Sequence, residues 1–100
     1  MSAPSVSGRG LRHLQWSGDV EIERAPEVRR ELLQALAQGE SVVVDLGAVR
    51  RLDTAGIAVL VEALHKARAA GLNLRLTQAG DAVGRMLKLT RLDDLIEIDR

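Results

Sequence analysis

The stretch that most constrains the fold of this chain is residues 42–60, where a β-branched run leads through a polar turn into a helical pattern. The run Val42-Val43-Val44 predicts a strand buried on both faces, because a half-exposed strand would alternate apolar with polar residues. A turn of small and polar residues follows at 52–56, directly before the helical pattern. In α/β proteins the functional surface tends to lie at such a turn, above the end of the sheet. We therefore expect the rest of the chain to act as scaffold around it.

The order of the other patterns predicts an α/β fold with a largely parallel sheet. Helical periodicity or helix-start residues mark three helices, at 25–38, at 54–70 and from Asp81 onward. Asp81 is the expected N-cap of the third helix. Strands are expected at 11–16, 20–22, 41–46 and 73–77, with a turn at 17–19 and a last strand or helical turn at 95–98. Alternating helices and strands favour parallel pairing through right-handed crossovers.

The composition predicts one small globular domain and argues against a dedicated nucleic-acid-binding domain. With 100 residues the chain has room for one modest core. Its 14 basic and 14 acidic residues cancel, whereas a protein that binds DNA or RNA needs a basic excess. Trp16 is the only aromatic residue, so no stacking platform for bases is expected. The sequence leaves open whether Trp16 is a core residue or an exposed anchor.

The chain shows no sign of export or membrane insertion. It has no cysteine, and residues 1–10 are small and polar rather than apolar as in a signal peptide. The longest apolar run, 57–61, is far shorter than the ~20 residues of a membrane span. We therefore expect a cytoplasmic protein, with a disordered tail at 1–10 and a single domain at 11–100.

The sequence gives little support to an enzyme. His13 and His65 lack the spacing of a shared metal site and no nucleophile motif surrounds them. Asp93 and Asp94 are adjacent and are expected to be turn formers. Neither a phosphate-binding loop nor a dinucleotide-binding glycine pattern is present. We expect no catalytic residue, no metal and no cofactor.

Two polar features allow both a structural and a functional interpretation. Asp53 or Thr54 can simply cap the second helix while Gly56 lets it approach the sheet. The same helix start, with its exposed N–H groups and hydroxyl, is also suited to docking a partner. On the third helix Arg85, Lys88 and Arg91 form either a basic stripe for an acidic partner or a solvated face, and the second is the simpler interpretation.

In order along the chain, these segments resemble the STAS family of sulphate transporters and anti-sigma factor antagonists. The resemblance covers 11–98, and its most specific part is Asp53-Thr54-Ala55-Gly56 behind a hydrophobic strand. The segments at 18–22, 25–29 and 83–95 are also similar to these proteins. The resemblance implies a small mixed sheet of four or five strands, with three to four helices packed mainly on one side. It also implies a non-enzymatic role in binding a protein partner.

In the antagonist branch, the resemblance implies a partner that is both an anti-sigma factor and a serine kinase. Such a kinase modifies the serine just before the glycine of the turn. In this chain that position is Ala55, which has no hydroxyl, so Thr54 is the only candidate for phosphorylation in the turn. A phosphate there would add about −1.5 to −2 charges beside Asp53.

Two branches of the family fit this departure. The leading hypothesis is a cytoplasmic regulator of the anti-sigma factor antagonist type that binds an anti-sigma factor or signalling kinase. The alternative is an MlaB-like subunit that binds the ATPase of a phospholipid-transport ABC complex. Homodimerisation is left open. In either case the expected partner-binding residues lie at the start of the second helix: Asp53, Thr54, Ala55, Gly56, Ala58 and Glu62.

Overall fold

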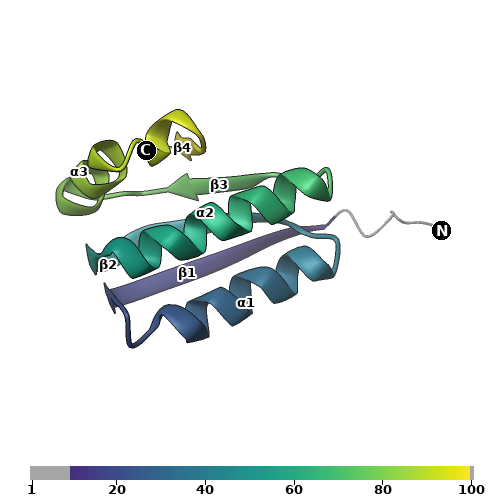
Figure 1. Cartoon of the computed structure of the whole chain (residues 1–100), viewed down its shortest axis with the longest axis horizontal. Helices are drawn as coiled ribbons and strands as arrows, with labels where there is room; N and C mark the ends of the chain where they lie inside the picture. Colours follow the sequence, from purple (N-terminus) through teal and green to yellow (C-terminus); the bar gives the residue numbers. More distant parts are fainter. Residues whose placement is uncertain (1–9, 100) are drawn as a thin grey trace.

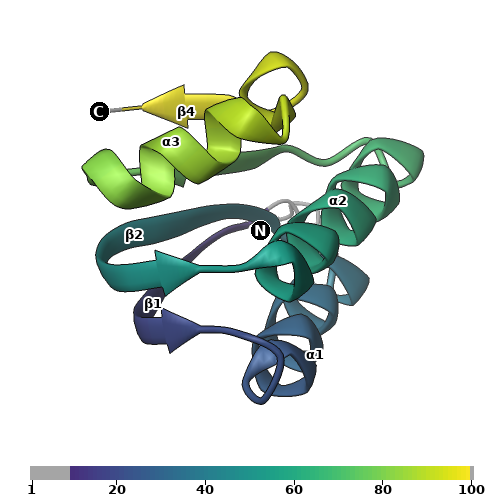
Figure 2. The ribbon, with the colours of Figure 1, turned by 60° about the vertical axis from the view of Figure 1, so that its left-hand side comes forward.

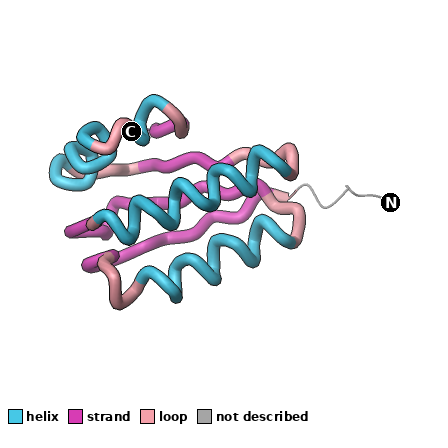
Figure 3. The backbone as a smooth tube through the Cα atoms, viewed as in Figure 1, coloured by secondary structure: helices cyan, strands magenta, loops and turns pink. Residues whose placement is uncertain are grey.

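The computed structural model describes residues 10–99, in which strands and helices alternate (Figures 1 and 3). The order is β1 (Leu11–Val20), α1 (Ala25–Ala37), β2 (Ser41–Leu52), α2 (Thr54–Ala69), β3 (Leu74–Thr77), α3 (Asp81–Leu89), a 3₁₀ helix (Leu92–Asp94) and β4 (Glu97–Asp99). The predicted tail lies outside the described residues except for Gly10, whose carbonyl accepts a hydrogen bond from the Ser41 N–H at 3.0 Å. The predicted α/β class is confirmed.

The described strands form one sheet in the order β1-β2-β3-β4. All three strand pairs are parallel, which differs from the mixed sheet that the family resemblance implies. The reason is that each connection between described strands contains a helix that carries the chain back before the next strand begins. The strand count of four falls within the predicted range. Helices α1 and α2 lie side by side over one face, and α3 packs against β2 near the end of the sheet (Figures 1 and 2).

Strand β1 is one continuous strand, so the predicted turn at 17–19 is wrong. The glycine and its polar neighbours mark irregular pairing instead. Gln15 pairs with Asp45 while Ser17 pairs with Ala48, and a second register shift follows between Gly18 and Asp19. Gly18 has a φ of +71°, which glycine adopts without strain. Because β1 continues to Val20 as a pairing partner and the two extra residues are in β2, that strand reaches Leu52 rather than ending at Leu46 as predicted.

The register shifts determine which β2 side chains face the core. Val42, Val44 and Leu46 are buried at every second position, as a regular strand requires. After the first shift the spacing becomes three, so that Val49 and Leu52 are buried as well. The strand therefore keeps its apolar side chains toward the helices up to the residue before the N-cap of α2.

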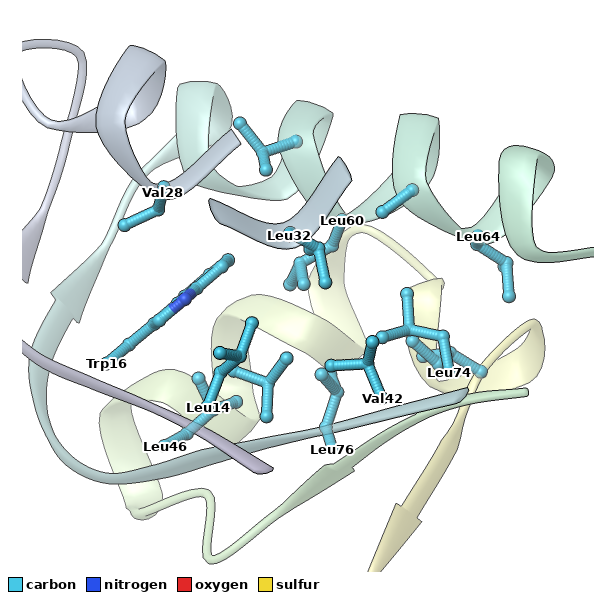
Figure 4. Packing of buried hydrophobic residues seen from close by; sticks show 14 of the residues in the cluster. Leu14, Trp16, Val28, Leu32, Val42, Leu46, Leu60, Leu64, Leu74 and Leu76 are labelled. Carbon is cyan, nitrogen blue, oxygen red and sulfur yellow. The ribbon is translucent and has the colours of Figure 1, made fainter. Parts of the chain in front are cut away.

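The core lies between the sheet and the helices and is almost entirely aliphatic (Figure 4). Trp16 is 1% exposed and belongs to this core, which settles the question that the sequence left open. Val42, Val43 and Val44 are at most 5% exposed, as predicted for a strand buried on both faces. The buried residues of α1 repeat at helical spacing: Val28, Leu32, Ala35 and Leu36.

The helix ends mostly follow the predicted signals. Pro26 lies in the first turn of α1, and Gly39 and Gly71 have positive φ values just beyond the ends of α1 and α2. The predicted N-cap at Asp81 is wrong, because Gly80 holds that position and Asp81 is the first residue of α3. There its carboxylate still lies in the first turn, where the helix dipole favours a negative charge.

Candidate functional site

Asp53 caps α2, which decides between the two candidates, Asp53 and Thr54, that the sequence left open. Its backbone is extended, with φ of −98° and ψ of −174°, and its Oδ1 accepts hydrogen bonds from the N–H groups of Ala55 at 2.9 Å and Gly56 at 3.1 Å. These two N–H groups would otherwise have no partner in the first turn of the helix. Asp53 is therefore a structural residue of this turn, whatever else binds there.

Gly56 holds the start of α2 against the ends of two strands. A Cβ atom at this position would lie 2.4 Å from the Leu52 Cδ1 atom and 3.0 Å from the Val20 carbonyl oxygen. The same Val20 carbonyl accepts a hydrogen bond from the Asp53 N–H at 3.3 Å. The close approach requires glycine, and it fixes the first turn of α2 where β1 and β2 end (Figure 2).

The accessible part of this turn is smaller than the predicted set of contact residues. Thr54 and Ala58 are exposed, and Ala55 is half-buried. Gly56 is buried, so its role in the structure is packing against the sheet. Within residues 10–99, the Thr54 hydroxyl has no hydrogen-bond partner and is free to interact with a molecule outside the chain.

Glu62 lies two turns further along α2 and is held by α1. Its two carboxylate oxygens accept hydrogen bonds from Nε and Nη2 of Arg29, both at 2.7 Å. The hydrogen bond from Arg29 lowers the pKa of Glu62, and the charges of Arg29 and Lys66 act in the same direction. The effect of Lys66, which lies four residues further along α2, is smaller than that of the Arg29 hydrogen bond, which joins two helices. Sequence reasoning missed Arg29, because no pattern links residues 33 positions apart.

The other candidate residues do not assemble into a chemical site. His13 and His65 are exposed on β1 and α2, and Asp93 and Asp94 lie in the 3₁₀ helix. The described part of the chain contains no cluster of three or more His, Cys, Asp or Glu residues placed to hold a metal. Arg85 and Lys88 are exposed on α3, but Arg91 lies beyond the helix and pairs with Asp94 at 3.2 Å. The predicted stripe of three cations is therefore interrupted.

The structure contains no candidate for a transmembrane helix. Among the helices between residues 10 and 99, none combines the length and the apolar character that crossing a bilayer requires.

Comparison with known proteins gives the same family as the sequence motifs. An anti-sigma-B factor antagonist of Bacillus subtilis is 27% identical over 82 residues, which cover 82% of this chain and 75% of that protein. The corresponding protein of Listeria monocytogenes is 32% identical over 84 residues, covering 82% and 73%. The solved structure of the anti-sigma factor antagonist SpoIIAA in its unphosphorylated form shares the fold, with a TM-score of 0.78 at 13% identity over 95% of this chain and 84% of that one. A family model described as "Mlab, STAS domain" matches residues 9–97, and the chain therefore belongs to the STAS domain family.

Proposed function

We propose that this protein is a non-enzymatic cytoplasmic regulator that acts by binding a partner protein through the start of α2. The observation that carries the proposal is the exposed Thr54 and Ala58 on a helix start that is itself held rigidly by Asp53 and Gly56. The similarity to anti-sigma-B factor antagonists supports a partner of the anti-sigma factor or signalling-kinase class.

Binding in this proposal does not depend on a serine switch. The residue before the glycine is Ala55, whose N–H group is used by the cap and whose methyl side chain cannot accept a phosphoryl group. Thr54 is the one hydroxyl residue in the turn, and its side chain is exposed. A phosphate on Thr54 would be favoured by the helix dipole and opposed by the neighbouring Asp53 carboxylate. Thr54 thus acts as a contact residue, and it is the position to examine for modification.

The first experiment is affinity capture of the tagged protein from its own cell lysate, with captured proteins identified by mass spectrometry. Thr54→Arg places a long cation in the centre of the proposed surface and should abolish capture of the specific partner. Ala69→Arg is the matched control, because it adds the same side chain at an exposed position at the other end of α2. Equal capture by wild type and the Thr54→Arg protein, with both variants folded, would show that the partner binds elsewhere.

A second candidate is a subunit that binds the ATPase of a phospholipid-transport ABC complex. Two observations favour it: the matching family model carries the description Mlab, and the turn retains a threonine while lacking the serine. The same capture experiment separates the two functions. An ABC ATPase among the Thr54-dependent proteins supports transport, whereas an anti-sigma factor or signalling kinase supports regulation.

A further inference from the structure

A groove of about 940 Å³ lies along α1, apart from the residues that cap α2. Its principal lining residues are Ile22, Pro26, Arg29, Arg30 and Leu33, together with Val59 of α2. Positions 29, 30 and 33 lie on the same side of the helix as position 26, because they follow it by three, four and seven residues. This side is distinct from the stripe of α1 that is buried in the core.

The groove displays apolar surface at the rim as well as at the base. Ile22 is 69% exposed, although it is a large aliphatic residue. Val59 is only 5% exposed, so its atoms form part of the base, and Leu33 is half-buried beside it. A single exposed isoleucine is ordinary on a protein surface, but one placed at a concave apolar surface offers a contact for another apolar side chain.

The charged side chains that line the groove are all basic. They are Arg29 and Arg30, and no carboxylate from residues 10–99 is part of the lining. Arg29 is already neutralised by Glu62, whereas Arg30 forms no ion pair within the part of the chain that the structure describes. Since the chain as a whole has no net charge, the positive character of this groove is a local property.

The groove is continuous with the start of α2. Val59 follows Ala58 directly and lies one helical turn after Ala55. Ile22 follows the end of β1, where the Val20 carbonyl contacts the Asp53 N–H. The part of the groove at Ile22 and Pro26 therefore lies at the same end of the molecule as the start of α2, where α1 also begins (Figure 1). A partner bound at Thr54 can reach the groove without crossing the body of the protein.

We propose that this groove binds a segment of the partner protein in which aliphatic side chains alternate with carboxylates. The aliphatic side chains contact Ile22, Leu33 and Val59, while a carboxylate pairs with the guanidinium of Arg30. The inference rests on the proposed function, because it supplies a second contact for the same partner. It names the chemistry of that contact and a set of residues separate from the Thr54 turn.

The test uses two short amphipathic peptides with the same leucines, one carrying glutamates and the other lysines. Each is titrated into the isotope-labelled protein while backbone amide shifts are followed by NMR. We expect the glutamate peptide to shift the amides of Ile22, Arg30 and Val59, and the lysine peptide to bind at least about tenfold more weakly. Raising the ionic strength from about 0.05 M to about 0.5 M should weaken binding of the glutamate peptide, because salt screens exposed charges.

Arg30→Glu should lower the affinity for the glutamate peptide by about tenfold or more and raise the affinity for the lysine peptide. Lys88→Glu is the matched control, because it makes the same change in net charge at an exposed position on α3, outside the groove. Equal affinities for the two peptides, shifts outside the groove, or no shifts at millimolar peptide would overturn the proposal. A dimer in sedimentation that dissociates on Ile22→Ser would also overturn it, since a second copy would then occupy the groove.

The outcomes for the groove and for the start of α2 can be told apart. Peptide binding is measured on the wild-type protein and partner capture on the Thr54→Arg protein, because Thr54 does not line the groove. If the glutamate peptide binds the groove but Thr54→Arg still captures the partner, the proposed function fails and the groove assignment stands. If Thr54→Arg abolishes capture and neither peptide binds, the groove assignment fails alone.

Discussion

Arg29 of α1 and Glu62 of α2 face each other across the two helices and form a bidentate pair, with both N···O distances at 2.7 Å. The pair is partly exposed, with 51% and 36% of the respective side-chain surfaces accessible. Geometry of this kind orients two helices that otherwise meet through aliphatic side chains. It also couples the folding of the chain to pH.

We expect the stabilisation from this pair to be present at neutral pH and lost in acid. The pKa of Glu62 is lower in the folded protein than its ordinary value of 4.5, chiefly because Arg29 hydrogen-bonds the carboxylate. The folded state therefore binds this proton less readily than the unfolded state, and the stabilisation fades as the pH falls from the unfolded pKa through the folded one. In urea unfolding, the free energies of unfolding of wild type and Glu62→Gln should differ at pH 7 and converge in acid. A difference that grew on acidification would contradict this assignment.

Replacing Gly56 with alanine should lower the free energy of unfolding by about 1–3 kcal/mol, because the added methyl group meets Leu52 and the Val20 carbonyl. Gly84→Ala is the control within a helix. Its Cβ atom meets nothing within 4 Å, so it should stabilise the protein by about 0.5–1 kcal/mol through better helix propensity. Chemical denaturation gives both values. Equal effects of the two variants would mean that the close approach at Gly56 is absent.

Removing the cap by Asp53→Ala should lower the free energy of unfolding by about 0.5–2 kcal/mol, since the N–H groups of Ala55 and Gly56 lose their acceptor. Asp53→Asn keeps an acceptor oxygen at the same position and should retain most of the stability. Comparing the urea midpoints of the two variants separates capping from charge. If asparagine proved as costly as alanine, the carboxylate charge rather than the hydrogen bonds would be the stabilising element.

Trp16 should report the integrity of the core. Because its side chain is 1% exposed, its emission should be blue-shifted in the folded protein and move to longer wavelength on unfolding. Trp16→Ala should lower the free energy of unfolding by about 3–5 kcal/mol. Trp16→Phe should lower it less, because it leaves a smaller cavity and removes an indole N–H that has no hydrogen-bond partner among the residues that the structure describes. Circular dichroism measures these variants, which have no tryptophan emission. An emission maximum typical of solvated indole would contradict the burial of Trp16.

The purified protein should not turn over ATP. The expectation comes from the sequence, which has neither a phosphate-binding loop nor a nucleophile motif. Steady ATP hydrolysis that scales with protein concentration and co-purifies with the chain would refute it. Binding of a nucleotide without turnover would be compatible with a regulatory protein.

Local sequence signals were sufficient for the helices but not for the irregular pairing of β1 with β2. The bounds of α1 and α2 follow from a proline, a capping aspartate and terminal glycines, which act within a few residues. Ser17-Gly18-Asp19 has the composition of a turn, and only the neighbouring strand converts it into part of a continuous β1. The misplaced N-cap at Asp81 has a similar origin, because an aspartate is favourable both at the cap and in the first turn.

For the candidate site, the sequence predicted a cap at Asp53 or Thr54 and the need for a glycine at position 56. It did not predict which residues serve the fold and which remain accessible. Asp53 and Gly56 are used by the fold, and Thr54 and Ala58 remain accessible. The cross-helix partner of Glu62 was not predictable, because pairing across 33 positions depends on how the two helices pack. Long-range pairing is a property of the assembled structure rather than of any short segment.

The close approach of Gly56 to Val20 also limits how this surface can diverge during evolution. A side chain at position 56 would push α2 away from the sheet, and a residue at position 53 without an acceptor oxygen would remove the cap. Under the proposed function, new partner specificity at this turn is therefore expected to arise by substitution at positions 54 and 58, where the side chains are exposed. Related chains that bind different partners would then keep the same backbone at this turn and differ mainly at these two positions.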